Sequence, residues 1–111
     1  MTDSFPLEIS VEETHRLVKA KPDAALLIDV REPDEVEICR LENARHIPMR
    51  QIPESLASLP TDRQLLIYCH HGGRSRRVTE YLRARGFSAA TNVAGGIDAW
   101  AQTIDPKMAR Y

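Results

Sequence analysis

Two short, mostly apolar runs constrain the fold of this chain more than any other feature: residues 25–30, with the acid Asp29 near the end, and residues 64–68, which open with Gln64. A strand that is apolar at consecutive positions, rather than at alternate ones, is typical of a parallel sheet with both faces covered. Segments with helical periodicity stand before, between and after the two runs, and the connections are short. The pattern therefore predicts an α/β fold with a mostly parallel sheet and helices on both faces.

Local signals place the remaining elements around these strands. The sequence Ser10-Val11-Glu12-Glu13 matches a capping box, which predicts a helix from there to about Ala20. Proline and glycine mark several of the other boundaries. The further expected elements are short helices opened by Glu32-Pro33 and at 53–59, brief strands at 45–48 and within 87–93, a helix from Ser75 to Arg85 closed by Gly86, and a final helical turn at 97–101 after Gly95-Gly96.

Length, charge and cysteine content bound the class of protein. A chain of 111 residues is expected to form one domain, residues 1–111 with a core at about 20–103. The formal net charge of -1 gives no general attraction to nucleic acid, and no apolar run approaches the length of a membrane span. Residues 1–6 do not resemble a signal peptide, and 2 cysteines are too few for a secreted domain stapled by disulfides. We therefore expect a cytoplasmic protein that binds neither nucleic acid nor membrane.

The second apolar run leads directly into a loop with the features of a reactive cysteine. The run is followed by Cys69, His70, His71, Gly72, Gly73, Arg74 and Ser75. Sites form at the carboxyl ends of parallel strands, glycines let a loop turn several N–H groups toward one point, and a helix start and an arginine add positive charge. Each of these favours a thiolate, which is the nucleophilic form of cysteine. We interpret Cys69 as a nucleophile and residues 70–75 as a cradle for an anion.

The two histidines are interpreted as parts of this cradle rather than as metal ligands. Zinc sites usually combine paired ligands at characteristic spacings with a second cluster, which adjacent His70 and His71 lack in the sequence. A thiolate needs no general base, so we expect their backbone N–H groups to line the cradle and their rings to modulate access. A purely capping role is the alternative for Ser75. No metal and no cofactor is predicted.

Three motifs in order give the chain a resemblance to a known family. Cys69, Gly72, Arg74 and Ser75 fit the loop pattern Cys-x-x-Gly-x-Arg-Ser/Thr, residues 29–33 read Asp-Val-Arg-Glu-Pro, and residues 95–100 read Gly-Gly-Ile-Asp-Ala-Trp. On these motifs the chain resembles the single-domain rhodaneses, which are sulfurtransferases. The resemblance implies a five-stranded sheet and a ping-pong reaction. In that reaction Cys69 takes a sulfane sulfur from a donor such as thiosulfate, holds it as a persulfide, and passes it to cyanide or a thiol.

The chain departs from the family pattern just before Ile47-Pro48. Residues 39–44 read Cys-Arg-Leu-Glu-Asn-Ala where the family often has Gly-His-Ile-x-Gly-Ala. Asn43 in place of glycine is compatible with a left-handed turn, whereas Arg40 in place of histidine leaves any role of that histidine without a counterpart. We expect these changes to affect stability or specificity rather than the chemistry of the loop.

Residues outside the loop have alternative interpretations. Arg31 lies at the end of the first apolar run, where it either contacts an anionic donor or forms a structural ion pair with Asp29. Cys39 is interpreted as a partly buried bystander, although a disulfide between Cys39 and Cys69 would switch the enzyme off.

Two rival functions stay open on the sequence. Phosphatases and arsenate reductases with a similar loop typically have one more residue between the cysteine and the arginine, and the 4 residues between Cys69 and Arg74 fit a smaller sulfur atom better. The second rival is a persulfide carrier or regulatory module that relays sulfur to a protein partner. The same cysteine would serve that function.

Overall fold

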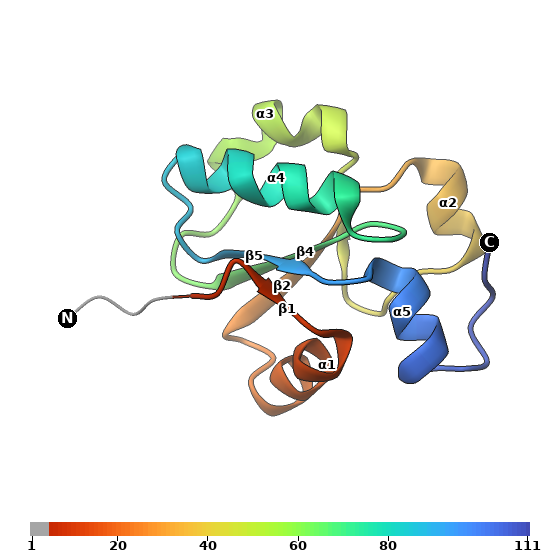
Figure 1. Ribbon diagram of the computed structural model, residues 1–111. Helices are drawn as coiled ribbons and strands as arrows, with labels where there is room; N and C mark the ends of the chain where they lie inside the picture. Colours follow the sequence, from red (N-terminus) through yellow and green to blue (C-terminus); the bar gives the residue numbers. More distant parts are fainter. Residues whose placement is uncertain (1–4) are drawn as a thin grey trace.

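The computed structural model describes residues 5–111, in which strands and helices alternate around one parallel sheet (Figure 1). The elements are β1 (Glu8–Ile9), α1 (Val11–Ala20), β2 (Ala25–Asp29), α2 (Pro33–Ile38), β3 (Arg45–His46), the 3₁₀ turn η1 (Met49–Gln51), α3 (Ile52–Ser55), the 3₁₀ turn η2 (Leu56–Ser58), β4 (Gln64–Tyr68), α4 (Gly73–Ala84), β5 (Ala90–Val93) and α5 (Gly96–Thr103). The strand order is β1-β5-β4-β2-β3, and every pairing is parallel. The predicted α/β fold with a five-stranded parallel sheet is confirmed, and β4, which leads into the loop, is the central strand.

Helices cover both faces of the sheet, as predicted. In Figure 1, α3 and α4 lie above the sheet, and α1 and α5 lie below it. Successive residues of β4 enter different clusters, because side chains alternate along a strand: Ile67 packs with Val78 of α4, whereas Leu66 and Tyr68 pack on the side of α1 and α5. All three β4 residues are fully buried, which explains the continuously apolar run. Cys69 continues the alternation onto the α4 side.

Local signals placed several boundaries correctly. Ser10 caps α1, and its side-chain oxygen accepts a hydrogen bond from the N–H of Glu13 at 3.1 Å. Asn43 has a φ of 65°, the left-handed geometry expected there. The helix expected at 53–59 is instead the short series η1, α3 and η2 between Met49 and Ser58. None of these three turns has a side-chain cap.

The helix after the loop begins earlier than predicted, at Gly73 rather than at Ser75. Gly72, the residue before it, has a φ of 110°, a conformation that glycine adopts without steric cost. The turn into α4 is therefore made by the glycine backbone and not by a capping side chain. Ser75 lies in the first turn of α4, so the capping role considered for it is wrong.

The amino-terminal part of the described chain adds a strand that the sequence did not reveal. β1 pairs with β5 at the edge of the sheet, and it is only 2 residues long, which is too short for a recognisable pattern. None of the helices between residues 5 and 111 has both the length and the hydropathy that crossing a membrane requires. Residues 1–4, on which the signal-peptide expectation partly rests, lie outside the described residues.

Candidate active site

Cys69 lies at the carboxyl end of the central strand, and its thiol is enclosed by the loop that follows. Only 1% of the residue is exposed. The backbone N–H of Gly72 donates to Cys69 Sγ at 3.1 Å, and the N–H of Ser75 donates to it at 3.4 Å. The first N–H groups of a helix have no partner within the helix, and that of Ser75, in the first turn of α4, is directed at the sulfur near the positive end of the α4 dipole. The structure thus brings the predicted nucleophile and the start of the predicted helix together.

A buried polar pair supports the thiol from the side of β5. The Oγ of Ser75 lies 3.3 Å from Cys69 Sγ and 2.5 Å from Asn92 Oδ1, so the two acceptors compete for its single hydroxyl hydrogen. The amide of Asn92 donates to the carboxylate of Glu8 at 2.7 Å and to the carbonyl of Gly72 at 3.3 Å, which fixes its orientation. Sequence reasoning missed Asn92. Its available signal was an amide side chain within the short strand expected at 87–93.

The amino end of α5 holds the loop from the opposite side. The N–H groups of Ile97 and Asp98 donate to the carbonyl oxygens of Cys69 and His70 at 2.9 and 3.0 Å. Because none of the described peptide bonds is cis, the N–H groups that follow these carbonyls point away from α5. Gly96 permits this close approach, since it has a φ of 60° and a Cβ there would lie 2.5 Å from the His70 oxygen.

The rings of His70 and His71 form a stack over the loop together with Tyr111. The centroids of the two histidine rings are 3.9 Å apart. The Tyr111 ring also stacks on His70, with a centroid distance of 3.8 Å and an angle of 11° between the two ring planes. Burial and the neighbouring His71 lower the pKa of His70, so its ring is neutral at neutral pH. The three rings thus pack together beside the loop. Tyr111 comes from the segment 104–111 after α5, which carried no recognisable periodicity.

Arg74, which the sequence offers as a free positive charge, is paired in the structure. Its Nη1 and Nη2 donate to Oε1 and Oε2 of Glu35 at 2.7 and 2.8 Å, so both arms of the guanidinium are engaged. The hydrogen bonds from Arg74 lower the pKa of Glu35 to about 2, which keeps it a carboxylate. Sequence reasoning missed Glu35, because α2 and the loop are distant in the chain and nothing local links them.

Arg31 lies inside the protein rather than on the surface of the site. The residue is 0% exposed, and its guanidinium donates to the carboxylate of Asp29 at 2.9 and 2.7 Å and to the Cys39 carbonyl at 2.7 Å. Of the two interpretations of Arg31, the structure shows the ion pair with Asp29. Because the residue is fully buried, an anionic sulfur donor at the surface does not reach its guanidinium in this arrangement. Cys39 and Cys69 are both free thiols.

One cluster of metal-ligand types does lie beside the loop. His70, His71 and Asp98 offer ligand atoms within 4.8 Å of one another. However, Nε and Nη2 of Arg110 both donate to Asp98 Oδ1 at 3.1 Å. A guanidinium in this position repels a cation, so the cluster is poorly suited to a metal ion.

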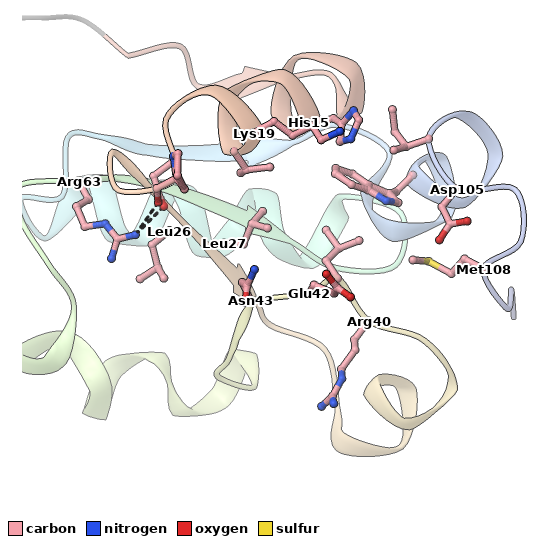
Figure 2. Close-up of a pocket in the computed structure, with 16 residues that line it drawn as sticks. His15, Lys19, Leu26, Leu27, Arg40, Glu42, Asn43, Arg63, Asp105 and Met108 are labelled. Carbon is pink, nitrogen blue, oxygen red and sulfur yellow. Dashed lines mark hydrogen bonds between the residues drawn. The ribbon is translucent and has the colours of Figure 1, made fainter.

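A large groove lies on the opposite face of the sheet from α4. It has a volume of about 830 Å³ and runs between α1, α5 and the segment 40–43 (Figure 2). Leu27 and Trp100 give it apolar surface, and Lys19 and Arg40 add positive charge. Arg63 also lines it and donates to the carbonyl of Ala25 at 2.7 Å. None of the residues 69–75 lines the groove, so it is separate from the reactive loop.

Comparisons with known proteins identify a family for this chain. The family model of the rhodanese-like domain matches residues 10–103. The chain is 36% identical over 110 residues to the rhodanese-like/PpiC domain-containing protein 12, chloroplastic, of Arabidopsis thaliana, with coverage of 94% of this chain and 37% of that protein. It is 37% identical over 83 residues to a sulfurtransferase of Allochromatium vinosum, with coverage of 75% and 78%. A crystal structure of a rhodanese-like domain protein from Staphylococcus aureus matches with a TM-score of 0.78 and 32% identity, over 94% of this chain and 97% of that one. The chain therefore spans little more than a third of the Arabidopsis relative and most of the other two.

Proposed function

Because the chain belongs to the rhodanese-like domain family, we propose that it is a sulfurtransferase in which Cys69 carries the transferred sulfur as a persulfide. The observation that carries this proposal is the enclosure of Cys69 Sγ by the N–H groups of Gly72 and Ser75 at the start of α4. These donors stabilise negative charge on sulfur without rearrangement. Preorganised donors of this kind are worth far more in a buried site than in water.

In the first half of the reaction, the Cys69 thiolate attacks the outer sulfur of a donor such as thiosulfate. A bond forms between Sγ and that sulfur while the S–S bond of thiosulfate breaks. The electron pair of the broken bond leaves with sulfite, a dianion, and the persulfide on Cys69 carries a single negative charge. Charge is conserved, and no external oxidant, metal or cofactor takes part.

In the second half, the nucleophilic sulfur of a thiolate acceptor, or the carbon of cyanide, attacks the outer sulfur of the persulfide. The bond between the two sulfurs breaks, and its electron pair returns to Cys69 as a thiolate. We propose that the N–H groups of His70 and His71, with those of residues 72–75, hold the charge on the outer sulfur between the two steps. The orientation of the first two, away from α5, supports this role.

The acceptor is proposed to be a small thiol or a thiol on a protein partner, in a reducing compartment such as the cytoplasm. The two free cysteines are consistent with such a compartment. The near-complete burial of Cys69 requires that either kind of acceptor reach into the loop. The separation of Cys69 and Arg74 by 4 residues supports sulfur rather than a phosphate ester as the group held there.

Intact-mass analysis after treatment with thiosulfate tests the proposal. We expect one added sulfur atom, removable by cyanide and absent from Cys69→Ser. Cys39→Ser is the matched control, because it removes the other thiol and is expected to keep the added sulfur. Thiosulfate is one donor among several, so a persulfide donor is tested in parallel. A mass unchanged with both donors, or an added sulfur that persists in Cys69→Ser, would refute the function.

A further inference from the structure

The positive charge nearest the reactive sulfur is already neutralised. Both arms of the Arg74 guanidinium donate to Glu35, and the side chain of Glu35 is only 17% exposed. The planar fork that an arginine offers to an oxyanion is therefore occupied by a carboxylate of the protein itself. An incoming sulfonate group would have to displace Glu35 to form the same two hydrogen bonds.

Tyr111 also holds Glu35 in the position in which it pairs with Arg74. Its hydroxyl donates to Glu35 Oε2 at 2.8 Å and accepts from Nη1 of Arg31 at 3.0 Å. Its ring stacks on His70 at 3.8 Å. Glu35 is thus held by a charged donor and a neutral donor at once, and the Tyr111 hydroxyl also occupies Nη1 of Arg31.

The charges around the loop balance before any substrate arrives. The two guanidinium groups, Arg31 and Arg74, face two carboxylates, Asp29 and Glu35, at 2.7 Å each. The Cys69 thiolate then makes the site negative. Like charges brought together in a site act against binding of the wrong partner. The negative site therefore repels a dianion, although the sequence alone predicted that Arg74 would attract one.

The two kinds of sulfur donor also differ in the charge of the group that leaves. Thiosulfate leaves as sulfite with two negative charges, whereas an organic persulfide, R–S–S⁻, leaves as R–S⁻ with one. In the persulfide reaction the Cys69 thiolate bonds to the outer sulfur, the donor S–S bond breaks, and its electron pair leaves with R–S⁻. A site in which the guanidinium groups of Arg31 and Arg74 are both engaged by carboxylates suits the monoanion.

We propose that Glu35, supported by Tyr111, is a specificity-determining residue that makes Cys69 accept sulfur from monoanionic organic persulfides in preference to dianionic thiosulfate. The inference rests on the proposed function, since it concerns which donor forms the Cys69 persulfide. Glu35 acts by occupying both arms of the Arg74 guanidinium and by neutralising its charge. Tyr111 acts through Glu35 and is a positioning residue.

The test is single-turnover loading of Cys69, followed by intact mass, with thiosulfate and with the persulfide of 2-mercaptoethanol. The measured quantity is the ratio of the two second-order loading rates. Glu35→Gln keeps the shape of the side chain but removes its charge, and it is expected to shift the ratio toward thiosulfate by roughly tenfold or more, the value of one charge-assisted hydrogen bond. Tyr111→Phe keeps the ring stack but removes the hydroxyl, and it is expected to shift the ratio in the same direction by a smaller factor.

Glu37→Gln is the matched control. Glu37 lies on the same helix, is exposed, and has the same charge change, so its ratio is expected to stay within about twofold of the unmodified protein. A ratio that is unaltered in Glu35→Gln, or altered equally in Glu37→Gln, overturns the inference while leaving Cys69 loading intact. Should Glu35→Gln fail to fold, an unaltered ratio in Tyr111→Phe overturns it instead. Absence of loading with both donors is a different result and overturns the proposed function.

Discussion

Replacing Gly96 by alanine tests whether the reactive loop depends on the close approach of α5. The backbone of Gly96 has a φ of 60°, and an added Cβ would lie 2.5 Å from the His70 oxygen, below the 3.0 Å that real Cβ contacts keep. The oxygen must therefore move by about 0.5 Å. It accepts the hydrogen bond from Asp98, and the neighbouring Cys69 carbonyl accepts one from Ile97.

The expected loss of stability follows from these contacts. Alanine in left-handed geometry costs about 1–2 kcal/mol, and weakening two hydrogen bonds costs about 1 kcal/mol each. We therefore expect Gly96→Ala to lower the free energy of unfolding by roughly 3–4 kcal/mol. Because the displaced carbonyls belong to Cys69 and His70, sulfur transfer is expected to fall as well.

Alanine substitutions at two other glycines separate the cost of the left-handed backbone from the cost of the close contact. Gly86 has a φ of 98° with no atom within 4 Å of an added Cβ, so Gly86→Ala carries the backbone term alone, about 1–2 kcal/mol. Gly73 has neither a left-handed φ nor a neighbour within 4 Å, so Gly73→Ala is expected to be neutral or stabilising by up to about 1 kcal/mol. The measurement is urea unfolding followed by the fluorescence of Trp100, the single tryptophan. A Gly96→Ala protein no less stable than Gly86→Ala would refute the reasoning about close approach.

Three further predictions concern the surroundings of the loop. Ser75→Ala removes the hydroxyl beside Cys69 but keeps the backbone donor, so persulfide formation is expected to slow by roughly fivefold in stopped-flow loading; an unchanged rate would show that the hydroxyl serves Asn92 alone. Asp29→Asn leaves the buried charge of Arg31 without its partner, and chemical unfolding is expected to show a loss of about 3–5 kcal/mol; a loss below about 1 kcal/mol would contradict the buried ion pair. Glu35, with its pKa lowered to about 2, binds fewer protons in the folded than in the unfolded protein, so its contribution is complete above about pH 4.5 and disappears as the pH falls toward 2. The stability difference between the unmodified protein and Glu35→Gln should shrink over that range, and a difference independent of pH would exclude the mechanism.

The sequence was sufficient for those features whose causes are contiguous in the chain. Residues 64–68 are buried on both sides of a central strand, and the four consecutive residues Leu65, Leu66, Ile67 and Tyr68 predict this burial directly. The thiol, the glycines and the helix start also follow one another without interruption. Their arrangement around one sulfur atom was therefore predictable from local rules alone.

The features that could not be predicted depend on partners far away in the chain. Arg74 was expected to be available to an anion, because nothing near it in sequence indicates that Glu35 would occupy it. The interpretation of Arg31 was undecided for the same reason, since its burial follows from how α2 and Tyr111 pack around it. Gly96 was identified as part of a motif, but its purpose is visible only where α5 meets the Cys69 carbonyl.

The dependence of the loop on α5 also has a consequence for synthesis of the chain. Proteins emerge from the ribosome amino end first, so the segment with Cys69 appears before β5 and α5 exist. At that stage the carbonyls of Cys69 and His70 have no N–H groups from Ile97 and Asp98 to bind, and Asn92 is not yet present beside Ser75. The nascent chain therefore contains the thiol without its cradle. The donors that shape the loop around Cys69 are therefore complete only when β5 and α5, the last strand and helix, have joined the sheet.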